Sequence, residues 1–166
     1  MNNKVQDKKE RWLALAKKIG DAKNSFVTIG FQAPGGDEKH PEKNSRASVS
    51  EIAFYHEFGA AGAGIPERSF IRSSFDANIE NLNKRKDDLI TEILLDRLEP
   101  KNALNSLGFM MQEIIKNKIN TSNMWAKKLK PRTIKRKAKG SLRAPDHPLI
   151  DSGLMLRSVS FKFHEK

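Results

Sequence analysis

Histidine and glutamate stand side by side at His56 and Glu57, and this pair is the first place where the chain could do chemistry. A metalloprotease helix carries the pattern His-Glu-x-x-His, in which two imidazoles bind zinc and the glutamate activates a water molecule. The second histidine of that pattern would stand at position 60, which is occupied by Ala60. We therefore interpret the pair as structural, with both side chains hydrogen-bonded to neighbours or to backbone groups. The sequence predicts no metal site.

Two other patterns resemble functional motifs without completing them. The run from Gly59 to Gly64 contains only glycine and alanine, but no Gly-Lys-Ser/Thr follows it, as a phosphate-binding loop requires. No serine stands in a Gly-x-Ser-x-Gly motif. We interpret Gly62 and Gly64 as parts of a surface loop with spare conformational freedom, which orders against a partner during assembly. No enzymatic activity, catalytic residue or cofactor is expected.

The positive charge of the chain is concentrated in one stretch. The chain has 31 Lys and Arg residues against 20 Asp and Glu, and no acidic residue stands between Glu113 and Asp146. Such a stretch attracts phosphate groups or an acidic protein surface. We call residues 127–143 the basic segment, and its candidate DNA- or partner-facing residues are Lys127, Lys128, Lys130, Arg132, Lys135, Arg136, Lys137, Lys139 and Arg143. A solvated basic helix without a ligand is the alternative interpretation.

Composition limits the remaining possibilities. The chain lacks cysteine, which excludes disulfides and zinc–thiolate sites. Its start is polar and charged, so we expect no signal peptide, and no apolar run approaches the roughly 20 residues that span a bilayer. Trp125 is the one aromatic residue between Phe109 and Phe161, so the basic segment lacks the stacking platforms of single-strand binders. We expect a soluble protein without a membrane partner.

Hydrophobic periodicity predicts an α+β fold: a helix-rich single domain with a small antiparallel or mixed sheet and long loops. The expected segments are an N-terminal helix and strand (8–31), a loop or hairpin arm (32–47), helices (48–120), a basic helix with loops (121–148), and a closing helix and strand (149–163). Within them we expect helices over 8–19, 49–58, 66–98, 102–119, 131–139 and 151–156, and strands over 26–31 and 158–163.

Cap and packing residues give these elements their expected limits. Ser48 and Glu51 form a capping box, and Gly59 ends the short helix that they open. Pro66 begins the long helix, while Asn102 and Asp151 cap later ones. We expect the apolar stripe of the long helix to consist of Phe75, Ile79, Leu82, Leu89, Ile93 and Leu94, and the short helix to dock on the core through Tyr55, His56 and Phe58.

Two sequence blocks resemble the tail-completion and virion-morphogenesis proteins of tailed bacteriophages. The first is IAFYHEFG at 52–59 followed by IPERSFIR at 65–72, and the second runs from Trp125 to PLIDSG at 148–153. The residues that carry the resemblance are Tyr55, His56, Glu57, Phe58, Gly59, Pro66, Arg68, Phe70, Trp125, Ile150, Asp151 and Gly153. Residues 139–147 and the pair Leu154–Met155 depart from the family pattern.

The resemblance implies a non-enzymatic structural protein of the virion neck, which joins the head connector to the tail. It implies as partners a head–tail connector or adaptor and a tail-tube or tail-terminator protein, with self-association into a ring, hexameric in preference to dodecameric. It places the protein in the virion at the top of the tail, after a stage in the host cytoplasm. Non-specific contact with packaged DNA fits the basic segment. The alternative is a free nucleic-acid-binding protein that uses residues 127–143.

Overall fold

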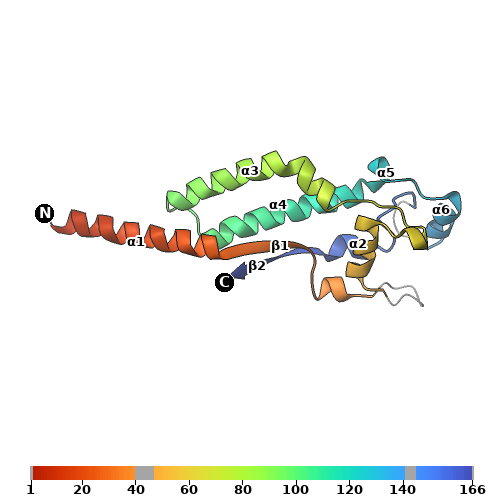
Figure 1. Cartoon of the computed structure of the whole chain (residues 1–166), viewed down its shortest axis with the longest axis horizontal. Helices are drawn as coiled ribbons and strands as arrows, with labels where there is room; N and C mark the ends of the chain where they lie inside the picture. Colours follow the sequence, from red (N-terminus) through yellow and green to blue (C-terminus); the bar gives the residue numbers. More distant parts are fainter. Residues whose placement is uncertain (1, 40–46, 141–144, 166) are drawn as a thin grey trace. The chain divides into compact units, whose positions relative to one another are not determined.

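A computed structural model describes residues 2–39, 47–140 and 145–165 of the chain, with side chains from residue 8 onward. It is a helix-rich α+β fold with a small antiparallel sheet, which confirms the predicted fold class. The elements in chain order are α1 (Asn2–Asn24), β1 (Ser25–Phe31), η1 (Gly35–Asp37), α2 (Val49–Phe58), η2 (Ala61–Ala63), α3 (Arg72–Leu94), α4 (Pro100–Asn120), α5 (Ser122–Trp125), α6 (Pro131–Ala138), α7 (Leu154–Ser158) and β2 (Val159–Glu165) (Figure 1).

The sheet pairs β1 with β2, so the two strands predicted near opposite ends of the chain do meet. Along β1, Val27, Ile29 and Phe31 are half-buried whereas Phe26 and Thr28 are exposed, as the alternation predicts. No strand forms over residues 32–39 of the predicted arm, where η1 and an isolated bridge from Lys39 to Ser48 are found instead. Residues 40–46 of that arm lie outside the described residues.

The chain divides into two compact units. Unit 1 consists of residues 1–28, 78–110 and 162–166, and unit 2 of residues 29–77 and 111–161. Four elements, β1, β2, α3 and α4, contribute residues to both units. The predicted single domain therefore spans both units, and the two are described separately below.

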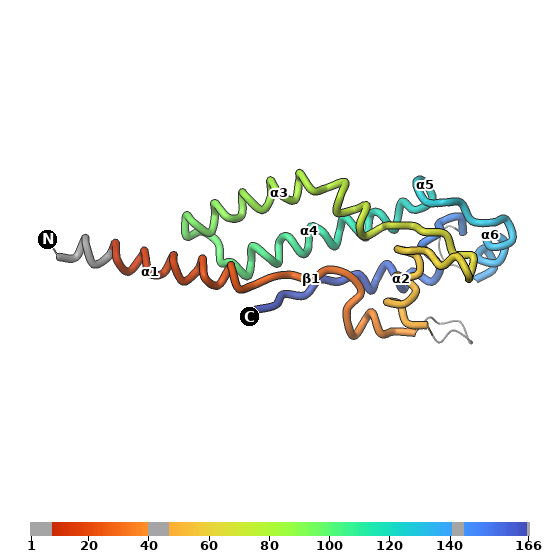
Figure 2. Tube along the Cα trace, in the orientation of Figure 1, coloured from red at the N-terminus to blue at the C-terminus, as the bar shows by residue number. Residues whose placement is uncertain are grey.

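Unit 1 is built around the contact between α3 and α4, which run alongside one another in the trace (Figure 2). Its buried cluster is Leu89, Ile93 and Ala103, with Leu98 and Leu107 packed against it. The predicted stripe of α3 is wrong at three positions, because Phe75, Ile79 and Leu94 are exposed.

Three helix limits in unit 1 also differ from prediction. Helix α1 runs through Gly20 rather than ending there, and its Trp12 is exposed. Helix α3 ends at Leu94, and Asp96 then takes a positive φ of 62°. Asn102 lies inside α4, which begins at Pro100, so it is not the predicted cap.

Unit 2 has its own core, in which Val49, Phe70, Ile115, Ile119 and Val159 are almost fully buried. These residues come from α2, the segment before α3, the end of α4 and the start of β2. The predicted capping box of α2 is present: Ser48 Oγ accepts from the Glu51 N–H, and Glu51 Oε2 accepts from the Ser48 N–H at 2.7 Å. None of the described helices combines the length and the apolar character needed to cross a membrane.

Candidate functional site

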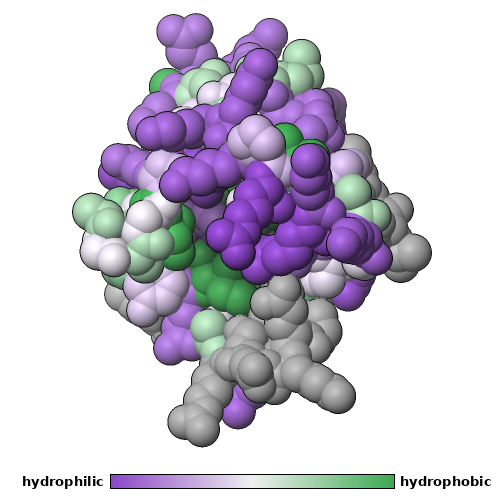
Figure 3. Space-filling view, turned by 90° about the vertical axis from the view of Figure 1, so that its right-hand side faces the viewer, coloured by the Kyte–Doolittle hydropathy of each residue, from purple (hydrophilic) through white to green (hydrophobic). Residues whose placement is uncertain are grey.

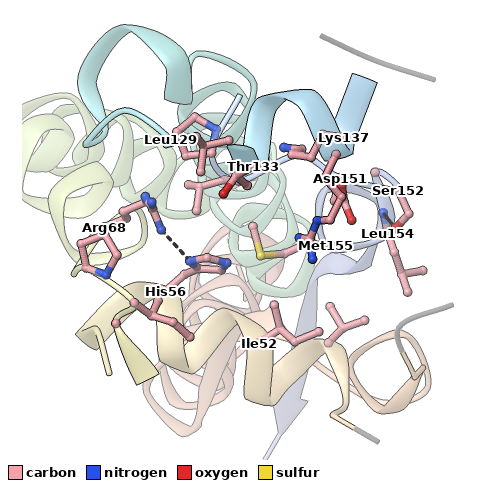
Figure 4. A pocket seen from close by; sticks show the side chains of 18 residues that line it. Ile52, His56, Arg68, Leu129, Thr133, Lys137, Asp151, Ser152, Leu154 and Met155 are labelled. Carbon is pink, nitrogen blue, oxygen red and sulfur yellow. Dashed lines mark hydrogen bonds between the residues drawn. The ribbon is translucent and has the colours of Figure 1, made fainter. Parts of the chain in front are cut away.

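A cavity of about 480 Å³ opens in unit 2. It is lined by residues of both sequence blocks described above, 52–72 and 125–153, which we call the family-like blocks. Residues 49–56 of α2 and 64–68 form one side, and Leu129, α6 and residues 148–155 form the other. The blocks are separated by more than fifty positions in the chain, yet their side chains face one another here (Figure 4). Seen from the end that carries α2 and α6, the surface is hollowed, with an apolar floor between hydrophilic side chains (Figure 3).

The carboxylate of Glu57 organises the first block. Glu57 is 3% exposed, and its Oε2 accepts hydrogen bonds from the backbone N–H groups of Phe70 and Ile71, both at 2.8 Å. Its Oε1 accepts from the Ser69 hydroxyl at 2.8 Å and from the backbone N–H and Nε of Arg72, both at 3.0 Å. Five donors from one turn therefore converge on a single buried carboxylate.

This turn explains why α3 begins later than predicted. The N–H groups of Phe70, Ile71 and Arg72 precede or open α3, where no intrahelical acceptor exists for them, and Glu57 supplies one from another helix. The prediction that Pro66 starts the helix is therefore wrong, because residues 66–69 are not helical and α3 begins at Arg72. Burial alone raises the pKa of Glu57, but the hydrogen bonds from Ile71, Arg72 and Ser69 outweigh it and lower the pKa.

His56 and Arg68 contact one another at the edge of the cavity (Figure 4). Nη1 of Arg68 lies 3.1 Å from Nδ1 of His56, and the Arg68 N–H donates to the His56 carbonyl at 2.7 Å. Burial, followed by the charges of Arg68 and Lys137, lowers the pKa of His56 to about 4. The imidazole is therefore neutral at pH 7 and accepts the guanidinium hydrogen through Nδ1.

Lys137 departs from the role expected for the basic segment. Its side chain is buried, with 6% exposure, and Nζ donates hydrogen bonds to the carbonyls of His147 and Ile150. Burial lowers the pKa of Lys137, while the nearby Asp151 and Asp146 raise it. The prediction that Lys137 faces DNA or a partner is wrong, because this ammonium ties α6 to the 147–150 segment.

The other described members of the basic segment keep their side chains in solvent. Lys127, Lys128 and Lys130 precede α6, and Arg132, Lys135, Arg136 and Lys139 lie on it or at its end, all exposed. Arg143 lies outside the described residues. That these exposed cations face DNA or a partner stays a prediction.

The aromatic residues of α2 point away from the core. Phe54, Tyr55 and Phe58 are 58%, 44% and 52% exposed, and the Phe54 and Phe58 ring centroids are 4.8 Å apart. The Arg72 guanidinium lies 4.6 Å from the Phe58 ring centroid. The predicted docking of α2 through Tyr55 and Phe58 is therefore wrong. Val49, Ala53 and Glu57 are the buried residues of this helix.

The glycine–alanine loop has a defined backbone. Ala60 and Ile65 form an isolated bridge that encloses η2, and Gly64 adopts the left-handed conformation with φ 68°. Gly62 and Gly64 are exposed, and a Cβ atom at either would meet nothing within 4 Å. Gly59 differs, because its φ is 76° and a Cβ there would lie 2.9 Å from the Glu67 nitrogen. Its conformation is positive in φ as predicted for a helix end, although extended in ψ.

The second block also holds structural roles. Trp125 Nε1 donates to the Lys118 carbonyl at 2.9 Å, and the Lys118 amine lies 4.6 Å from the ring centroid. Asp151 lines the cavity and does not cap α7, which begins at Leu154 after Gly153 in the left-handed conformation. The predicted cap at Asp151 is wrong, because the Leu154 N–H donates to Ser152 Oγ instead.

The cavity wall is suited to holding an anion. It combines the buried cations Arg68 and Lys137, the exposed Arg136 and one carboxylate, Asp151, with many apolar side chains. Among the described residues, no group of three or more His, Asp or Glu could hold a metal ion. The chain matches no protein-family model, no curated protein and no solved structure.

Lys137 lines the cavity, and its role was predicted wrongly because all basic residues of the basic segment were treated alike. On α6 it stands three residues after Ile134 and four after Thr133; Lys137 is buried and the other two are half-buried. This i, i+3, i+4 relation places a residue on the buried face of a helix whatever its charge. Helical periodicity, applied to the lysines as well as to the apolar residues, would have identified it.

We expect Glu57→Gln to lower the free energy of unfolding by about 3 kcal/mol, because an amide cannot accept all five hydrogen bonds and its NH₂ group faces donors. The matched control is Glu67→Gln, which loses an exposed ion pair with Arg72 and should cost less than about 1 kcal/mol. Urea unfolding of the three proteins measures the difference. Equal losses in both variants would contradict the central role of Glu57.

The lowered pKa of His56 predicts a specific pH dependence. The unfolded chain takes up a proton near pH 6.5 and the folded chain only near 4, so acid favours the unfolded state between these values. His56→Gln removes this contribution. We expect the stability difference between wild type and His56→Gln to shift by roughly 2–3 kcal/mol in favour of the variant between pH 7 and pH 4. If the unfolding free energies of wild type and His56→Gln, measured in urea, changed equally with pH, the prediction would be contradicted.

Proposed function

We propose that this chain is a non-enzymatic structural protein of a bacteriophage neck, which joins the head connector to the tail as the protomer of a ring. The observation that carries the proposal is the convergence of the two family-like blocks on one cavity. The first block supplies His56 and Arg68 to the cavity wall, and the second supplies Lys137, whose Nζ donates to the Ile150 carbonyl.

The chemistry of the first block supports a structural role. Both oxygens of Glu57 are occupied by hydrogen bonds that fix the turn before α3, and the neutral His56 is occupied by Arg68. Rigid internal residues leave the outward-facing ones to make contacts between subunits. The exposed rings of Tyr55 and Phe58 and the loop at Gly62 and Gly64 are candidate contacts of this kind.

A ring places copies of each surface around one axis. Sixfold repetition, which we favour over twelvefold, multiplies the field of the exposed basic residues around a central passage. Such a field suits contact with packaged DNA or with acidic neighbours among the connector and tail-tube or terminator proteins. Under this proposal the protein acts in the virion neck, at the top of the tail, and is present in the host cytoplasm during assembly.

The test is reconstitution of joining in the phage or prophage that encodes the chain. Without the chain we expect filled heads and finished tails to accumulate separately, and the purified protein to join them in vitro. Electron microscopy of the joined particles should then place a ring of this chain at the head–tail junction. Normal joining without the chain, or density for it elsewhere in the particle, would overturn the proposal.

Non-specific nucleic-acid binding is the second candidate, favoured by the exposed cations before and along α6. If phosphates bind there, the triple change Arg132→Ala, Lys135→Ala and Lys139→Ala should lower the slope of log affinity against log salt by roughly three for duplex DNA. Lys137 is left intact because it is buried. A matched control is Lys8→Ala, Lys9→Ala and Lys17→Ala on exposed positions of α1. Equal slopes for the two triple variants would exclude a site on the basic segment.

A further inference from the structure

A second hollow adjoins the cavity of unit 2. It measures about 710 Å³ and is bordered by residues 58–68 and 127–133. The two hollows share the lining residues Gly64, Ile65, Pro66, Arg68, Leu129 and Thr133. Because these six residues border both, the two hollows lie next to one another. We call the two together the groove, and its form suits an extended chain better than a compact small molecule.

The groove carries an excess of positive charge. Apart from the internally bonded Lys137, its basic lining residues are five, namely Arg68, Lys127, Lys128, Lys130 and Arg136, and its acidic ones are two, Glu67 and Asp151, which leaves an excess of three. Glu67 is already paired with Arg72 at 2.8 Å. An acidic occupant would therefore be attracted along the whole groove.

Within this lining, the Arg68 guanidinium is suited to bind an anion. Its side chain is 6% exposed, it borders both hollows, and its Nε has no hydrogen-bond partner among the described residues. Nη1 contacts the His56 ring, which carries no negative charge to balance the guanidinium. A buried guanidinium without a carboxylate is costly, and its planar fork matches the two oxygens of one.

Most of the other residues that line the cavity are apolar. Ile52, Ile65, Leu129, Leu154 and Met155 all border it, and the surface view shows a recessed apolar patch beneath hydrophilic side chains (Figure 3). A free inorganic anion would leave these side chains uncovered. A nucleic-acid backbone could pair with the lysines of the rim, but it has no aliphatic side chain to place on the floor. An occupant with both carboxylates and apolar side chains satisfies both parts of the groove.

We propose that the groove docks an extended segment of a partner protein in which carboxylate side chains alternate with apolar ones. One carboxylate pairs with Arg68, and a neighbouring apolar side chain enters the cavity between α2 and α7. The inference rests on the proposed function only for the partner's identity, a neighbouring virion protein. The groove itself belongs to the isolated chain.

The test uses the full chain and a fluorescent synthetic peptide of about ten residues that alternates glutamate with leucine, a length suited to an extended groove. Matched peptides alternate glutamine with leucine or glutamate with serine. Two charge reversals on α6 provide the decisive pair: Arg136→Glu, which borders the cavity, and Lys135→Glu, its exposed neighbour, which borders neither hollow. Both side chains are exposed, so both variants should fold.

We expect Arg136→Glu to weaken binding of the glutamate–leucine peptide roughly tenfold and Lys135→Glu less than about twofold, by fluorescence anisotropy. The His56 ring signals, assigned in NMR spectra with a His56→Gln variant, should shift on binding. Both control peptides should bind much more weakly.

Three results would overturn the proposal. The first is equal weakening by both reversals, which indicates diffuse attraction to the basic surface. The second is unchanged His56 signals at millimolar peptide. The third is a DNA duplex that binds more tightly than the peptide and displaces it, which assigns the groove to nucleic acid. Because no particle is involved, failure of the neck assignment would leave these measurements unaffected.

Discussion

A buried carboxylate needs several donors to stay ionised, and unit 2 meets this requirement at Glu57 with backbone and side-chain donors from residues 69–72. Transferring an unpaired carboxylate into a protein interior costs several kcal/mol, whereas five hydrogen bonds from residues 69–72 stabilise it there. The dependence is mutual, because the N–H groups at the start of α3 would lack an acceptor without Glu57. Helix α2 and the start of α3 are therefore held as one piece.

This constraint determines where the rest of the site lies. With the turn fixed, the preceding residues 65–68 run back along α2, and the Arg68 N–H reaches the His56 carbonyl. That path carries the Arg68 side chain into the cavity wall, opposite the segment that Lys137 holds through its bonds to His147 and Ile150. Arg68 and Lys137 therefore both border the cavity. The turn bound by Glu57 positions Arg68, and hydrogen bonds to the His147 and Ile150 carbonyls hold the Lys137 side chain.

Local signals in the sequence predicted local structure well. The capping box at Ser48, the alternation along β1 and the proline that opens α6 each depend on neighbouring residues, and all three are present. The failures concern contacts between distant residues. Pro66 looked like a helix start because nothing in its own neighbourhood shows that a glutamate nine residues earlier caps the helix at Arg72 instead. Tyr55 and Phe58 looked like core residues because aromatic side chains usually are, yet the glutamate between them takes the buried position.

The positive charges of the basic segment are also of two kinds, buried and exposed. Counting residues treats Lys135, Arg136 and Lys137 as equivalent. In the helix, Lys135 is exposed to solvent, Arg136 is exposed and borders the cavity, and Lys137 is buried. A ligand that recognises only net charge would be indifferent to this difference, as a phosphate backbone is. A ligand that enters the groove would depend on Arg136 and the backbone that Lys137 supports, and would ignore Lys135. The pattern of burial on a single helix therefore separates docking of a partner protein from general attraction to DNA.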